Sequence, residues 1–240
     1  MEAGRRQISV GDVLNETFSI YGQNFGALIG GAIVVFVLVG IASGLLQNSG
    51  GLVLGTLALI VELVGRAIFV GFVVRLVEDV RDGRRDHTVG DLFSSASDAI
   101  VPLIGFGILF GIGVGIGFIL LVIPGLFLLT MWSVGAPAIV VEKEGVIGAF
   151  GRSWNLVRGD GWRVFAVLLV VFLIGLAVSA VLLAIGNSIG NGASLVAGIV
   201  AAVITAPIYA IAVSALFFDL GGGGQGASAQ ASTATAPPAA

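Results

Sequence analysis

The sequence predicts an all-α integral membrane protein with six transmembrane helices, built as three repeats of an interfacial amphipathic helix plus a two-span hairpin. Three observations carry this prediction: the composition, the spacing of the apolar segments and the one-sided distribution of basic residues. Of the 240 residues, 57% are hydrophobic and 10% are charged, and the mean hydropathy is +1.11. Soluble domains carry about 25% charged residues, so this chain could not cover a water-soluble surface.

Six apolar segments approach or exceed the roughly 20 residues that cross a bilayer. They are residues 25–46, 52–74, 101–122, 126–141, 162–186 and 193–218. The fourth segment is the shortest, follows Pro124-Gly125 and contains Pro137. Since proline interrupts helical hydrogen bonding, we expect a short, kinked or tilted helix there.

The two ends of the chain differ from these segments. Residues 1–8 form a short polar N-terminus, and the apolar run that begins at Phe25 is longer than the core of a cleavable signal, which is about 7–15 residues. We therefore expect the first span to be retained. Residues 220–240 are small, polar and proline-containing, a composition that predicts a disordered cytoplasmic tail.

The basic residues indicate one orientation. Of the eleven Lys and Arg residues, all except Arg66 fall at the N-terminus, in the connections after the second and fourth spans or, for Arg163, at the very start of the fifth span. The connections 47–51, 124–125 and 186–192 carry no charge. The positive-inside rule then predicts a protein of the cell membrane with both termini on the cytoplasmic side.

A short pattern repeats on that face. Val-Gly-Asp follows a hydroxyl residue twice, with Ser9 three residues before Asp12 and Thr88 three residues before Asp91. This spacing suits a helix-capping box, and the stretch from Gly145 reads as a third copy without the acid. The pattern predicts amphipathic helices that lie in the membrane interface, at residues 9–24, 88–100 and 145–158.

Glu62 and Arg66 form a candidate intramembrane ion pair. They lie near the middle of the second span, four residues apart and with the acid first, the favourable order for a helical pair. Each charge alone costs roughly 2.5–3.5 kcal/mol at a helix centre. Two interpretations are open: a midplane site for a charged or zwitterionic group or a proton, and a self-neutralised structural pair that faces the bundle.

The stretch 150–165 concentrates arginine and tryptophan. Arg152, Arg158 and Arg163 are candidate contacts for lipid headgroups, and Trp154 and Trp162 are candidate interfacial anchors. The basic residues are too few for a nucleic-acid groove.

The sequence has few residues that could act in catalysis. The chain has no cysteine, a single histidine (His87) and one carboxylate in mid-membrane, so we expect no enzyme activity, metal or cofactor. The glycines at 105–117 lack the Gly-Lys-Ser/Thr ending of a phosphate loop. Their spacing of four residues favours close helix packing.

Residues 123–165 resemble the core of the glycerophosphoryl diester phosphodiesterase membrane-domain family. The resemblance rests on Pro124-Gly125, Pro137, Glu142, Arg152-Ser153-Trp154 and Arg158-Gly159. In some members this membrane domain precedes a catalytic barrel, which has no counterpart after Asp219. The resemblance therefore implies a stand-alone membrane domain of undefined role.

Two functions follow from these observations. The first is a non-enzymatic scaffold or accessory protein that acts through helix packing and headgroup contacts, with membrane lipids and a second copy or another membrane protein as partners. The alternative is a transporter or exporter of a lipid-like or amphipathic solute, with its site at Glu62 and Arg66.

Overall fold

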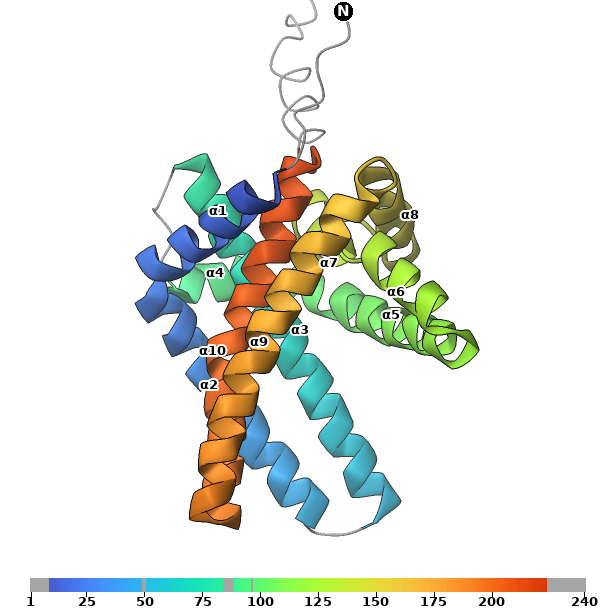
Figure 1. The fold of residues 1–240 in the computed structure, drawn as a ribbon. Helices are drawn as coiled ribbons and strands as arrows, with labels where there is room; N and C mark the ends of the chain where they lie inside the picture. Colours follow the sequence, from blue (N-terminus) through green and yellow to red (C-terminus); the bar gives the residue numbers. More distant parts are fainter. Residues whose placement is uncertain (1–8, 49–50, 84–88, 96, 224–240) are drawn as a thin grey trace, which may run out of the picture.

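The structure is a computed structural model that describes residues 9–48, 51–83, 89–95 and 97–223. In these ranges all regular secondary structure is helical, and most of it belongs to three hairpins (Figure 1). The hairpins pair α2 (Phe25–Asn48) with α3 (Leu52–Asp82), α5 (Ile100–Leu120) with α6 (Val122–Met131), and α9 (Gly161–Ile189) with α10 (Asn191–Asp219).

Six helical segments of the described chain are long and apolar enough to cross a membrane, which confirms the predicted all-α, multi-pass class. One of the six, Val122–Glu142, combines α6 with α7 (Gly135–Glu142). The second span is longer than expected, because α3 runs eight residues beyond the predicted end at residue 74. Its 31 residues measure about 46 Å at 1.5 Å per residue, more than the hydrocarbon core of about 30 Å.

The three hairpins do not all point the same way. The α2–α3 and α9–α10 hairpins extend to the end of the molecule opposite the start of α1 and the end of α10, whereas the α5–α6 hairpin points out to the side (Figure 1). The two helices of this hairpin touch backbone to backbone, since a Cβ added at Gly117 would lie 2.9 Å from the Cα of Gly125. Glycine is therefore needed at this crossing.

Short helices precede the hairpins: α1 (Val10–Gln23), α4 (Val89–Ser95) and α8 (Val146–Val157). Ser9 caps α1 by accepting a hydrogen bond of 3.4 Å from the backbone N–H of Asp12. Thr88, the expected cap of the second helix, lies outside the described residues. That helix is not continuous to residue 100, since α4 ends at Ser95 and a 3-10 turn, η1 (Ser97–Ala99), follows.

The polar residues around η1 offer a reason for this interruption. The hydroxyl of Ser94 donates to the carbonyl of Asp91, and that of Ser97 donates to the carbonyl of Ser94. Local bonds of this kind compete with helical backbone pairing.

Helices α3 and α10 form the centre of the packing. Phe72 and Val77 of α3 and Ile211, Leu216 and Phe217 of α10 are fully buried. The ring of Phe72 stacks on Phe93 of the α4 segment with 4.4 Å between centroids.

The fourth apolar segment is divided by a turn. Helix α6 ends at Met131, and α7 begins at Gly135 with Pro137 in its first turn, where the missing N–H costs no helical bond. A Cβ at Gly135 would lie 2.3 Å from the Phe106 ring, so a larger residue there would force this ring of α5 to move. Ser133 of this turn lines a cavity together with residues of α5.

Candidate functional site

The Glu62–Arg66 pair forms as the sequence spacing predicts, but protein does not cover it. A guanidinium nitrogen of Arg66 donates to the Glu62 carboxylate over 2.5 Å. The Arg66 side chain is 66% exposed and that of Glu62 is 40% exposed. From the start of α3 at Leu52, the two residues lie about 15 Å and 21 Å along the helix, distances shorter than the thickness of a bilayer core, which is about 30 Å.

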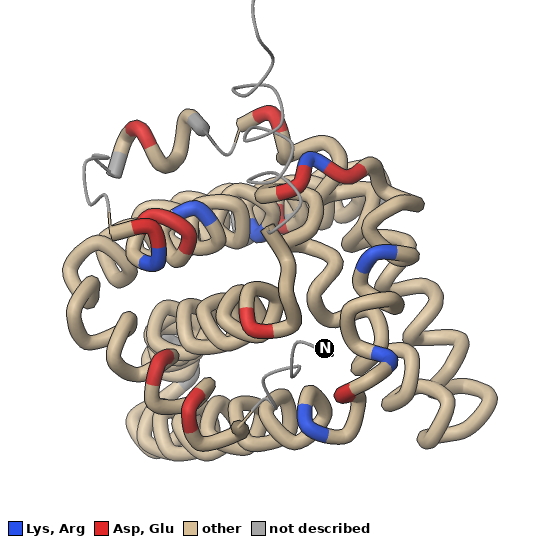
Figure 2. The backbone as a smooth tube through the Cα atoms, turned by 90° about the horizontal axis from the view of Figure 1, so that it is seen from above, with Lys and Arg blue, Asp and Glu red and all other residues tan. Residues whose placement is uncertain are grey.

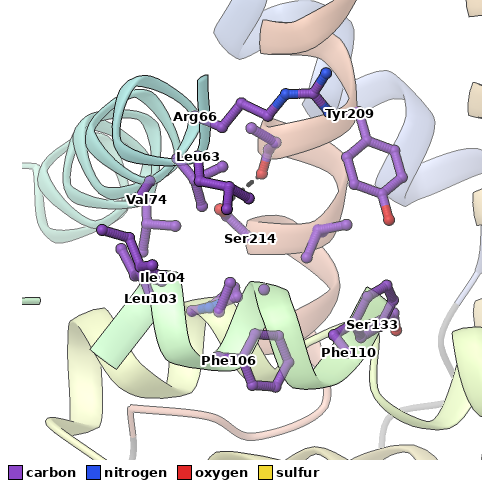
Figure 3. A pocket seen from close by; sticks show the side chains of 17 residues that line it. Leu63, Arg66, Val74, Leu103, Ile104, Phe106, Phe110, Ser133, Tyr209 and Ser214 are labelled. Carbon is purple, nitrogen blue, oxygen red and sulfur yellow. Dashed lines mark hydrogen bonds between the residues drawn. The ribbon is translucent and has the colours of Figure 1, made fainter. Parts of the chain in front are cut away.

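Two cavities adjoin this pair. The first, which we call the α2 cavity, has a volume of about 350 Å³ and lies between α2, α3 and α10; its lining includes Ser43, Glu62 and Arg66. The second, the α5 cavity, has a volume of about 280 Å³ and lies between α3, α5, the α6–α7 turn and α10 (Figure 3). Arg66 lines both cavities and is the residue that joins them.

The α5 cavity has a polar end and an apolar floor. Figure 3 shows Arg66 and Tyr209 at one end, away from Leu103 and Phe106. The Tyr209 hydroxyl makes no hydrogen bond within the described part of the chain. Two serines also line the cavity, but their hydroxyl protons are engaged: Ser133 donates to the carbonyl of Thr130 and Ser214 to that of Ala210.

A second set of charged residues lies at the end of the fold that carries the termini. Figure 2 views the helices from this end and shows basic positions next to acidic ones. Arg81 of α3 binds Glu16 of α1 at 2.6 Å and Asp219 of α10 at 2.8 Å, and its guanidinium lies 5.3 Å from the ring centre of Phe218. This cluster ties three helices together.

Arg152 is engaged by the protein itself. It donates two hydrogen bonds to Glu142, at 2.6 and 2.7 Å, and the same carboxylate accepts the backbone N–H of Gly223 at 2.9 Å. The two side chains are only 17% and 9% exposed. The bonds to Glu142 raise the pKa of the Arg152 guanidinium, which keeps it charged. The predicted headgroup contact of Arg152 thus competes with a bidentate partner inside the protein.

The other predicted headgroup residues differ in their surroundings. Arg163 pairs with Asp160 at 2.5 Å. Arg158 is exposed and makes no ion pair within the described residues. Trp162 is 80% exposed, whereas Trp154 is 37% exposed and packs edge-on against Phe127. The roles of these four residues in lipid contact stay predictions.

Sequence reasoning did not single out Tyr209 or Ser133 as parts of a site. The signal was weak: Tyr209 lies two residues after Pro207, a proline inside an otherwise apolar helix. Its proximity to Arg66 depends on how α10 packs against α3, which local spacing does not reveal.

Comparison of the chain with known protein families, with curated proteins and with solved structures finds no match. The class of the protein therefore rests on its own fold: an all-helical, multi-pass membrane protein with six apolar helices.

Proposed function

We propose that this protein is a non-enzymatic transporter that binds a lipid-like or amphipathic solute between its hairpins. The observation that carries the proposal is the Glu62–Arg66 pair, which lies deep along α3, is open on its outer side and borders two cavities. A pair that served the fold alone would be covered by neighbouring helices.

The hydrogen bonding of Arg66 supports the same proposal. A guanidinium has five N–H donors, and within the described chain Arg66 uses one of its nitrogens, for Glu62. Unsatisfied donors cost several kcal/mol each in hydrocarbon, where water is absent. A bound solute that supplies acceptors would remove this cost, and its departure would restore it.

The wider proposal concerns the setting of the site. We infer that the protein lies in the cell membrane with both termini on the cytoplasmic side, as the basic residues indicate. A short helix followed by two long ones occurs at α1–α3 and at α8–α10, which supports a repeat; in the middle unit the second long helix is replaced by α6 and α7. The sideways direction of the α5–α6 hairpin is the main departure from that repeat (Figure 1). Membership of the glycerophosphoryl diester phosphodiesterase membrane-domain family rests on residues 123–165 alone.

The proposal can be tested by flux in reconstituted vesicles. The double variant Glu62→Gln/Arg66→Met removes both charges together, so no unpaired charge remains in the membrane. We expect it to reduce movement of a fluorescent single-chain lipid across the bilayer to the protein-free rate. The matched control is Arg75→Met/Glu78→Gln, which removes a second ion pair of the same helix, 2.7 Å long, whose residues line neither cavity.

The control variant should retain the wild-type flux. Unchanged flux in the Glu62/Arg66 variant, at equal expression and reconstitution, would remove the site from the transport proposal.

A second candidate, an accessory protein that holds lipid headgroups, is favoured by the exposed and ion-pair-free Arg158 near the exposed Trp162. For this function we expect Arg158→Gln to lower the amount of anionic lipid that co-purifies with the protein, without any change in flux. The control is Arg152→Gln/Glu142→Gln, which also removes one arginine, but one that is bonded to Glu142 within the protein. If Arg158→Gln retains the same lipids as the wild type, headgroup binding by this residue is ruled out.

A further inference from the structure

The α5 cavity combines unsatisfied donors with an apolar floor. Its polar end holds the guanidinium of Arg66 and the hydroxyl of Tyr209, which has no hydrogen-bond partner within the described residues (Figure 3). Its other walls are mostly apolar and include Leu63, Val70 and Val74 of α3 and Leu103, Phe106 and Phe110 of α5. Such a site is matched by a molecule that has an acceptor-rich head and a hydrocarbon chain.

We propose that the α5 cavity binds an anionic amphiphile, with a carboxylate or phosphate head on Arg66 and Tyr209 and its chain between α3 and α5. This proposal rests on the transport function above and names its substrate class. The guanidinium donates to the head through the N–H groups that Glu62 does not use, and the tyrosine O–H donates a further bond.

The sign of the head group follows from the lining. Arg66 is the charged residue among the described residues around this cavity, and no carboxylate joins it there. Glu62 lines the α2 cavity and accepts a hydrogen bond of 2.5 Å from one guanidinium nitrogen of Arg66. An ammonium group in this cavity would meet the Arg66 guanidinium, whereas a carboxylate or phosphate can accept from the guanidinium N–H groups that Glu62 leaves free and from the Tyr209 hydroxyl. The serines offer no competing protons, because both bond backbone carbonyls.

The size of the cavity fits part of such a molecule. Its volume of about 280 Å³ is near the lower end of ligand pockets, which run from about 300 to 1,000 Å³. The cavity therefore holds the head and the first part of one chain, and the rest of the chain extends between the hairpins into the bilayer.

Glycines of α5 allow the cavity to be filled without disturbing the packing. Gly107 lines the cavity, and a Cβ built on it meets no atom within 4 Å. Gly107→Leu should block the binding of the chain. Gly111, one turn further along α5, is equally open but does not line the cavity, so Gly111→Leu is its matched control.

The test measures binding to the purified protein in neutral lipid discs. The probes are oleate and dodecyl phosphate, with oleyl alcohol and dodecyltrimethylammonium as uncharged and cationic counterparts. We expect both anions to bind at least about tenfold more tightly than the other two, and Tyr209→Phe to weaken the anions by about tenfold while the alcohol is unaffected. Gly107→Leu should abolish anion binding, and Gly111→Leu should preserve it.

A second pair of discs identifies the source of the ligand. If phosphatidylglycerol in the disc displaces oleate, a bilayer lipid is the ligand; if it does not, the ligand is a free single-chain anion, and both results support an anionic amphiphile. Equal affinity for the alcohol, or anion binding that survives both Tyr209→Phe and Gly107→Leu, would overturn the proposal.

The binding and flux assays distinguish a failure of this substrate site from a failure of the proposed transport function. Flux that depends on Glu62 and Arg66, together with binding insensitive to Gly107→Leu and Tyr209→Phe, would leave the transport function and remove this substrate site. Gel filtration and thermal unfolding of each variant exclude a folding defect, and Arg66→Lys, which keeps the charge, should retain measurable anion binding.

Discussion

Two glutamate–arginine pairs occupy opposite settings in this molecule. Glu142 and Arg152 meet at the end that carries the termini, where both side chains are largely buried and the carboxylate also binds the backbone of Gly223. Glu62 and Arg66 meet within a span, yet both are open and flanked by cavities. The Glu142 carboxylate accepts hydrogen bonds from both Arg152 and Gly223. In the second pair, by contrast, Arg66 has N–H groups that bond no other residue of the described chain.

This comparison indicates that the charges of Glu142 and Arg152 serve the fold, whereas those of Glu62 and Arg66 are accessible to a ligand. A pair that bridges two helices in a buried setting cannot lose one member without leaving an uncompensated charge. The Glu62–Arg66 pair lies on one helix and joins no two elements, so breaking it removes no contact between helices. The first pair is therefore expected to control stability, and the second to control binding.

The largest expected effect is at Arg152. Arg152→Met leaves the carboxylate of Glu142 without its bidentate partner, and we expect a loss of about 3 kcal/mol in the free energy of unfolding. Denaturant unfolding in lipid discs measures this change. Adding Glu142→Gln to Arg152→Met removes the stranded charge and should restore part of the loss. A single variant as stable as wild type would contradict the structural role.

Arg81 should rank next. Arg81→Met breaks its bonds to Glu16 and Asp219, which lie on different helices and are partly exposed. We expect a loss of about 2 kcal/mol, because each carboxylate retains access to water. Hydrogen exchange should show the loss as increased opening of α1, since Arg81 ties α1 to α3 and α10. If the amides of α1 in Arg81→Met are as protected from hydrogen exchange as in the wild type, Arg81 does not hold α1 against α3 and α10.

Ser153 tests the same end without charge. Its hydroxyl is fully buried and donates to the carbonyl of Met131 at 2.8 Å, which joins α8 to the end of α6. Ser153→Ala should cost about 1 kcal/mol of unfolding free energy. Thr205→Ala is a suitable control, because that hydroxyl bonds within its own helix at Ala201. If Thr205→Ala lowers the free energy of unfolding more than Ser153→Ala does, the bond from Ser153 to Met131 is not an important contact between α8 and α6.

The smallest effect on stability is expected at the open pair. Glu62→Gln/Arg66→Met should lower the free energy of unfolding by less than Arg152→Met does, because the pair joins no two helices and the double variant leaves no unpaired charge. The same unfolding assay applies. A loss as large as that of Arg152→Met would show that the open pair holds the fold together and would erase the contrast between the two regions.

The sequence could predict features set by composition and local spacing. The six apolar segments follow from hydropathy, and the Glu62–Arg66 pair follows from an interval of four residues on a helix. The Glu142–Arg152 pair spans a loop, and Arg81 and Asp219 are 138 residues apart, so both depend on tertiary packing. The same holds for the α5 cavity, whose polar end needs Tyr209 of α10 to approach Arg66 of α3.

The direction of the α5–α6 hairpin also lay beyond sequence reasoning. The predicted glycine contacts are divided in the structure: Gly117 packs against Gly125, but Gly107, Gly111 and Gly115 face open space. Glycine spacing indicates where helices can approach closely. It does not indicate which partner they meet or at what angle.

Native mass spectrometry of the protein extracted in lipid discs tests the central claim most directly. We expect the wild type and the Arg75→Met/Glu78→Gln control to carry a bound anionic amphiphile at a defined stoichiometry, and the Glu62→Gln/Arg66→Met variant to lose it. If all three proteins carry the same set of bound lipids in the same amounts, the open pair is not a ligand site.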